Sequence, residues 1–195
     1  MTILFTILTL ILFLRQANGQ DAGFVDLIFR NPNELEFTVT VGQETRSRFF
    51  LLSQASAWSP DRFILHHNSA RGLDTSAMLY LFTDSALNAL ISDNEKRHLM
   101  NQAMALVPRK VTNTYKTIKL ADTLHKPNNS YIYQLTEPIY TLDSTYAFID
   151  AAIYFPNEAD ISFHQAYEAQ MFFIFKRSNN SKWELIRKKV TMFLL

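Results

Sequence analysis

Residues 131–155, YIYQLTEPIYTLDSTYAFIDAAIYF, decide the fold of this chain. Two runs rich in aromatic and β-branched residues, Tyr131 to Tyr140 and Thr145 to Phe155, lie on either side of Leu142-Asp143-Ser144. Runs of that composition favour strands, and Asp and Ser favour a tight turn between them. The stretch therefore predicts an antiparallel hairpin.

A second hairpin of the same kind is predicted further along the chain. The runs Tyr167 to Lys176 and Lys182 to Leu194 flank the polar turn sequence Ser178-Asn179-Asn180-Ser181. Phe172 to Phe175 and Met192 to Leu195 are apolar on both strand faces, which is typical of central, covered strands. The alternative is an exposed terminal strand that pairs with a partner by edge addition.

The first half of the chain favours helices. Ser92 and Glu95 form a capping box, in which the Ser92 hydroxyl accepts from the Glu95 amide and the Glu95 carboxylate reaches back to the Ser92 amide. Pro108 is expected to end this helix. Its apolar residues recur at helical spacing: Leu99, Met100, Ala103 and Leu106.

Three weaker patterns complete the expected elements. Met78 to Leu90 predicts a second buried helix, Leu35 to Val41 with Arg48 to Leu52 predicts a hairpin, and Thr117 to Leu120 is a candidate fifth strand of the later sheet. The expected fold class is α+β, with N-terminal helices packed on one face of a curved antiparallel sheet. The C-terminal half would form a meander of four to five strands.

The first nineteen residues predict a cleavable signal peptide. An apolar run over residues 3–14 precedes Ala17 and Gly19, which suit a signal peptidase, so the expected cut follows Gly19. The run is much shorter than the ~20 residues that span a bilayer as a helix. Arg15 after the run, with no basic residue before it, departs from the usual pattern. We expect a secreted or periplasmic protein without a membrane anchor after cleavage, with a single domain over residues 20–195.

Composition narrows the function classes. The chain has no cysteine, which excludes disulfides, cysteine-ligated metals and thioether-linked lipids. Its 19 basic residues include Arg15, so cleavage after Gly19 leaves 18 basic against 18 acidic residues, and no nucleic-acid partner is expected. The histidines lack metal-ligand spacing and the four glycines form no phosphate-binding cluster, so no metal and no cofactor are predicted.

Short motifs of the C-terminal half resemble uncharacterised exported proteins of Bacteroidota-type bacteria. They are Tyr133 to Tyr140, Asp143 to Phe148, Phe172 to Lys176 and Ser181 to Ile186. Such proteins have no established activity, so the resemblance implies no catalytic residue. The order of a helix followed by a meander that closes on a Trp-bearing strand also resembles nuclear-transport-factor-2-like and cystatin-like α+β folds.

Strand register suggests a candidate site. If Asp143-Ser144 is a two-residue loop, the opposite residues are Ile139 and Phe148, Glu137 and Asp150, Leu135 and Ala152, and Tyr133 and Tyr154. The carboxylates of Glu137 and Asp150 would then face each other with their Cβ atoms ~5 Å apart. In the alternative register, Pro138 bulges the strand and both acids lie on a solvated surface.

Three function classes follow from the sequence. The first is a non-catalytic binding domain for a small molecule, peptide or envelope component, with Tyr133, Phe148, Asp150 and Tyr154 lining its pocket. The second is a hydrolase in which Glu137 and Asp150 act as an acid/base pair. The third is a structural or assembly module, indicated by the apolar C-terminal strand.

Overall fold

The computed structural model describes residues 23–30, 48–59, 89–111, 115, 117–122, 130–154 and 167–193. The predicted signal peptide and the strand predicted at Leu35 to Val41 lie outside these residues. The helix predicted at Met78 to Leu90 also lies outside them, except for its last two residues, which are helical.

Within the described residues, seven strands form one mixed sheet in the order β2-β1-β3-β5-β6-β7, with β4 beside β5. The predicted meander from β3 onward is antiparallel as expected. The sheet as a whole is mixed rather than the predicted antiparallel sheet, because β1 pairs in parallel with both β2 and β3. The strands are β1 Arg48–Leu52, β2 Lys119–Ala121, β3 Ser130–Leu135, β4 Ile139–Tyr140, β5 Tyr146–Tyr154, β6 Tyr167–Arg177 and β7 Trp183–Phe193.

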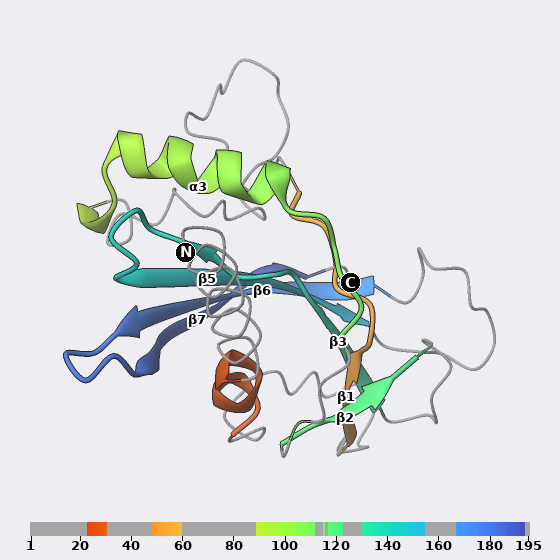
Figure 1. Ribbon diagram of the computed structural model, residues 1–195. Helices are drawn as coiled ribbons and strands as arrows, with labels where there is room; N and C mark the ends of the chain where they lie inside the picture. The colour runs from red at the N-terminus through yellow and green to blue at the C-terminus, as the bar shows by residue number, and fades with distance from the viewer. Residues whose placement is uncertain are drawn as a thin grey trace, which may run out of the picture.

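The described helices lie on opposite faces of the sheet rather than on one (Figure 1). Helix α3, Asp93–Ala105, covers one face, and the helical residues 23–28 cover the other. The N-cap of α3 is confirmed, because the Ser92 hydroxyl accepts from the Glu95 amide at 3.2 Å. The second half of the capping box differs, since the Glu95 carboxylate instead accepts from the Leu142 amide at 2.6 Å.

Strand alternation supplies the residues that each helix covers. On the α3 face, Leu99 and Ala103 pack with Phe148 of β5 and Phe172 and Ile174 of β6. On the other face, the aromatic and aliphatic residues of helix 23–28 pack over the aliphatic side chains of β5: Phe24, Val25 and Ile28 over Ala147, Ile149, Ala151 and Ile153. Both faces of the central strands β5 and β6 are therefore buried, and the predicted apolar run Phe172 to Phe175 is central, as expected.

A β-bulge separates β3 from β4 on the strand edge that faces β5. Ile139 pairs with Phe148 as predicted, but Leu135 pairs with Ala151 rather than with Ala152. The strand thus holds one residue more than its partner across residues 136–138. Pro138 explains the bulge, because proline has no N–H to give to the ladder.

The register beyond the bulge is shifted by one residue from the prediction. Tyr133 pairs with Ile153 rather than with Tyr154. The predicted pairing of Glu137 with Asp150 is also wrong, since the Thr136 amide donates to the Asp150 carbonyl at 2.9 Å. A shift of one residue moves a side chain to the other face of a sheet, so the shift decides where the candidate site residues lie.

None of the helices in the described ranges combines the length and the apolar composition needed to cross a bilayer.

Candidate functional site

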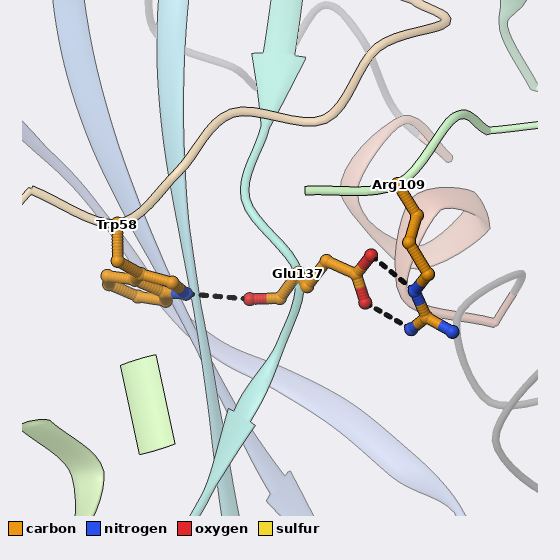
Figure 2. A network of polar contacts seen from close by, with 3 residues as sticks. All are labelled: Trp58, Arg109 and Glu137. Atoms are coloured by element: carbon orange, nitrogen blue, oxygen red, sulfur yellow. Dashed lines mark hydrogen bonds and ion pairs between the residues drawn. The ribbon is translucent and has the colours of Figure 1, made fainter. Parts of the chain in front are cut away.

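Glu137 lies in the bulge and accepts hydrogen bonds from side chains on two sides. Its backbone carbonyl accepts a hydrogen bond from the Trp58 indole at 2.8 Å, on the α3 face of the sheet. Its carboxylate points the other way, toward the guanidinium of Arg109, as Figure 2 shows. Arg109 donates from Nε at 2.7 Å and from Nη2 as well, which gives a two-bond fork of the kind that fixes both groups in one plane.

The backbone around Arg109 is held against the segment that follows β1. The Ala55 amide donates to the Arg109 carbonyl at 3.1 Å, and the Val111 amide donates to the Ser53 carbonyl at 2.6 Å. An antiparallel bridge between Gln54 and Lys110 lies between these two bonds. The ion pair therefore joins two segments that are both fixed by backbone hydrogen bonds.

A cavity of about 240 Å³ lies beside this ion pair. Its apolar walls come from helix 23–28 and from the strands β1, β3 and β5. Arg109, Lys110, Tyr115, Thr136 and Glu137 supply polar groups. The Glu137 side chain is only 10% exposed and that of Arg109 is 58% exposed, so the guanidinium connects the buried carboxylate to solvent. The apolar wall residues include Phe24, Val25, Leu51, Leu52, Leu135 and Ile149.

This arrangement suits binding more than acid/base chemistry. The Glu137 carboxylate accepts two charge-assisted hydrogen bonds from Arg109, and proton transfer to a substrate would have to break that fork. Apolar walls with a few fixed polar groups are the usual composition of a small-ligand pocket.

No family model, no curated protein and no solved structure matches this chain.

The four predicted ligand-binding residues are not brought together. Phe148, Asp150 and Tyr154 share the α3 face, whereas Tyr133 lies on the opposite face with its ring 5.0 Å from that of Phe29. Phe148 is fully buried among the protein's own side chains. The shared pocket expected over these residues is therefore not formed by them, because the one-residue shift at the bulge turned Tyr133 over.

The two tyrosines differ in their hydrogen bonding. The Tyr154 hydroxyl donates to Gln134 Oε1 at 2.9 Å, and burial raises the pKa of Tyr154 above its ordinary value. Burial also raises the pKa of Tyr133, by more than that of Tyr154, and the charge of nearby Tyr131 makes a smaller contribution in the same direction. Among the described residues, the buried Tyr133 hydroxyl has no hydrogen-bond partner.

The predicted carboxylate pair lies across the sheet rather than along one face. Glu137 lines the cavity together with Leu135, on the side of helix 23–28. Asp150 alternates with Ile149 and lies on the face of Phe148, where it is 4% exposed. The backbone of the sheet thus separates the two carboxyl groups, and they do not form the acid/base pair that the register suggested.

Of the two residues in the ion pair, only Glu137 had a signal in the sequence. Glu137-Pro138 carried a signal, because a proline inside a strand pattern indicates a bulge that can re-aim the preceding side chain. Arg109 carried none, since an arginine after a helix-ending proline is an ordinary surface residue. Only the antiparallel contact with residues 53–55 places it beside Glu137.

Proposed function

We propose that this chain is a non-catalytic binding domain whose cavity beside Arg109 and Glu137 holds a small molecule with an apolar body and a polar end. The observation that carries the proposal is the cavity itself, which combines apolar walls with a fixed ion pair on one side. The apolar body would lie against Leu51, Leu135 and Ile149, and the polar end would lie near the ion pair.

The volume of the cavity limits the ligand. Pockets for drug-sized ligands measure roughly 300–1,000 Å³, and this cavity of about 240 Å³ lies just below that range. A short aliphatic or single-ring compound fits such a space, whereas a long lipid or an oligosaccharide does not. A single apolar side chain of a peptide or envelope protein is the macromolecular equivalent.

Occupancy of the cavity can be tested with two probes of equal length, hexanoate and 1-hexanol. In methyl-detected NMR of the full domain, both probes should shift the methyl signals of Leu51 and Leu135 in a saturable way. Ala55 lines the cavity, so Ala55→Phe should fill the space and abolish these shifts. Ala105→Phe, which adds the same ring to an exposed position of α3, is the matched control and should leave them unchanged.

Three results would refute the binding proposal. They are an absence of saturable shifts with both probes, shifts that persist in Ala55→Phe, and an equal loss of shifts in Ala105→Phe.

Export is the second part of the proposal, with the mature chain beginning at Gln20. It is supported by the apolar run over residues 3–14, by the small residues Ala17 and Gly19, and by the resemblance of the C-terminal motifs to exported proteins. Intact mass spectrometry of protein from its native source should give a mass without residues 1–19. A mass that includes Met1 to Gly19 would contradict export by cleavage.

A further inference from the structure

A second pocket, of about 280 Å³, lies between α3, the β4–β5 turn and the β6–β7 hairpin. It has no lining residue in common with the cavity beside Glu137. The groups that matter for its chemistry come from all three elements: His98 and Gln102 from α3, Tyr140 and Ser144 from the β4–β5 region, and Arg177 and Trp183 from the hairpin.

Arg177 is the central group of this pocket. Its guanidinium lies over the Trp183 ring, with Cζ 5.8 Å from the ring centroid. Its Nε atom is buried, and within the described residues it has no hydrogen-bond partner. Buried polar atoms are nearly always hydrogen-bonded, so an unmet donor at the wall of a pocket can take its acceptor from a water or from a ligand that enters the pocket.

The other polar groups add donors rather than acceptors. Gln102 Oε1 already accepts from the Tyr140 amide, which fixes the orientation of the side-chain amide and leaves its NH₂ group as the donor end. His98 and Ser144 can each donate one hydrogen bond. The described residues that line the pocket include no carboxylate to balance the charge of Arg177. The lining thus has a positive charge and several donors.

The scaffold of the pocket is held in place by its own hydrogen bonds. The Asp143 carboxylate accepts from the Thr141 hydroxyl and from both the amide and the hydroxyl of Thr145, which fixes the β4–β5 turn. The Arg177 amide donates to the Thr145 carbonyl at 2.8 Å and joins β6 to that turn.

The Trp183 ring also packs against two other aromatic rings. The centroid of its ring system lies 5.2 Å from that of Phe24 and 5.9 Å from that of Tyr140. The platform under the guanidinium of Arg177 is therefore formed before any ligand arrives.

We propose that this pocket binds a small organic anion, whose carboxylate or phosphate group accepts hydrogen bonds from Arg177 and whose apolar part lies against Trp183 and Tyr140. A guanidinium presents two parallel N–H groups that match the two oxygens of such an anion. The buried Nε–H of Arg177 then gains the acceptor that it lacks among the described residues. The neighbouring aromatic rings favour an anion with a flat apolar body over a bare inorganic ion.

The proposal can be tested by ¹H–¹⁵N NMR, in which the Nε–H of Arg177 and the indole N–H of Trp183 report directly on the pocket. The full domain is titrated with inorganic phosphate, acetate and phenyl phosphate. Phenyl phosphate should shift both signals in a saturable way and should bind more tightly than phosphate or acetate. The indole N–H of Trp58, which donates to Glu137, serves as an internal control and should not move.

Two arginine substitutions separate this site from a general charge effect. Arg177→Gln should weaken phenyl phosphate binding roughly 10- to 100-fold, the loss expected for a hydrogen bond to a charged group. Arg97→Gln removes the same charge from an exposed position of α3 and should leave the affinity unchanged. Arg177→Lys keeps the charge without the planar fork and should bind with intermediate affinity, so it provides the same test if Arg177→Gln does not fold.

Each contrary outcome overturns the proposal. An absence of saturable shifts with all three probes would show that the pocket binds no anion. Equal affinities for phosphate and phenyl phosphate would show an adventitious ion only. Equal losses in the Arg97 and Arg177 variants would show attraction by net charge rather than a site.

Discussion

The Thr136 hydroxyl accepts a hydrogen bond from the Asp150 backbone amide at 2.9 Å, while the Thr136 amide donates to the Asp150 carbonyl at the same distance. A side chain thus takes the place of a backbone carbonyl in the ladder, at the point where the bulge has displaced the strand. Both residues are buried. The hydroxyl therefore provides an acceptor that the bulged backbone does not supply.

Replacement of Thr136 by valine should destabilise the fold. Thr136→Val keeps the shape of the side chain but leaves the buried Asp150 amide without this acceptor, which costs about 1–3 kcal/mol. Urea unfolding measures the loss. Thr117→Val removes an exposed hydroxyl that donates to Asp26 and should cost well under 1 kcal/mol, so equal costs for the two variants would contradict this account.

The two buried tyrosines should respond in opposite ways to the loss of their hydroxyl groups. Tyr133→Phe removes a buried hydroxyl that has no partner among the described residues, and it should leave stability unchanged or raise it by up to about 1 kcal/mol. Tyr154→Phe removes the donor to Gln134 and should cost about 1 kcal/mol. The comparison is made by thermal and urea unfolding, and a larger loss for Tyr133→Phe than for Tyr154→Phe would refute it.

The contact between Glu95 and the Leu142 amide should contribute to stability by joining the first turn of α3 to the β4–β5 turn. Glu95→Ala should cost about 1 kcal/mol in urea unfolding, and Glu95→Gln, which keeps an oxygen acceptor, should cost less. Asn94→Ala changes an exposed residue of the same helical turn and should stay within about 0.5 kcal/mol of the parent. A cost in Asn94→Ala equal to that in Glu95→Ala would assign the effect to the helix end instead.

Asp143 should make stability depend on pH in the acid range. Hydrogen bonds from the Thr145 side chain, and then from the Thr141 side chain, lower the pKa of Asp143 below its ordinary value. The folded state thus favours the ionised carboxylate, so the contribution is complete above about pH 4 and is lost as the pH falls through the lowered pKa. Asp143→Asn should therefore show a shallower loss of unfolding free energy between pH 7 and pH 3 than the parent.

Thr145→Val is the second arm of that measurement, because Thr145 is the largest cause of the lowered pKa. It should reproduce most of the shallower acid response while the carboxylate remains. An acid response of Asp143→Asn as steep as that of the parent would show that the turn contributes nothing to the pH dependence.

Local patterns predicted much of the C-terminal half. Ile139 was placed opposite Phe148, as observed, although the turn is not the predicted two-residue loop. The Thr141 amide donates to the Tyr146 carbonyl, so residues 142–145 form a four-residue loop, and a loop with the same centre gives the same register. The β6–β7 hairpin and the α3 N-cap at Ser92 were also predicted, since each depends on residues close together in the chain. The predicted register was wrong for the residues that precede Pro138, because the single extra residue of the bulge reverses the face on which their side chains lie.

The candidate site could not be predicted, because it depends on contacts between distant segments. Arg109 lies beside Glu137 only because residues 109–111 run along residues 53–55. β1 itself was expected in a hairpin, whereas its described partners are parallel strands far along the chain. Parallel pairing has no turn sequence to announce it, so a single sequence shows the strand but not its neighbours.

The position of β1 has a consequence for how the chain is made. Phe50 pairs with Lys119 on one side and with Ile132 on the other, so both neighbours leave the ribosome long after β1 does. At ~5–20 residues per second, the delay lasts several seconds. During that interval the apolar segment RFFLL has an open ladder on both edges, which invites association with other nascent chains. Arg48–Leu52 is therefore a segment of the nascent chain that needs the protection of a chaperone until β2 and β3 have been made.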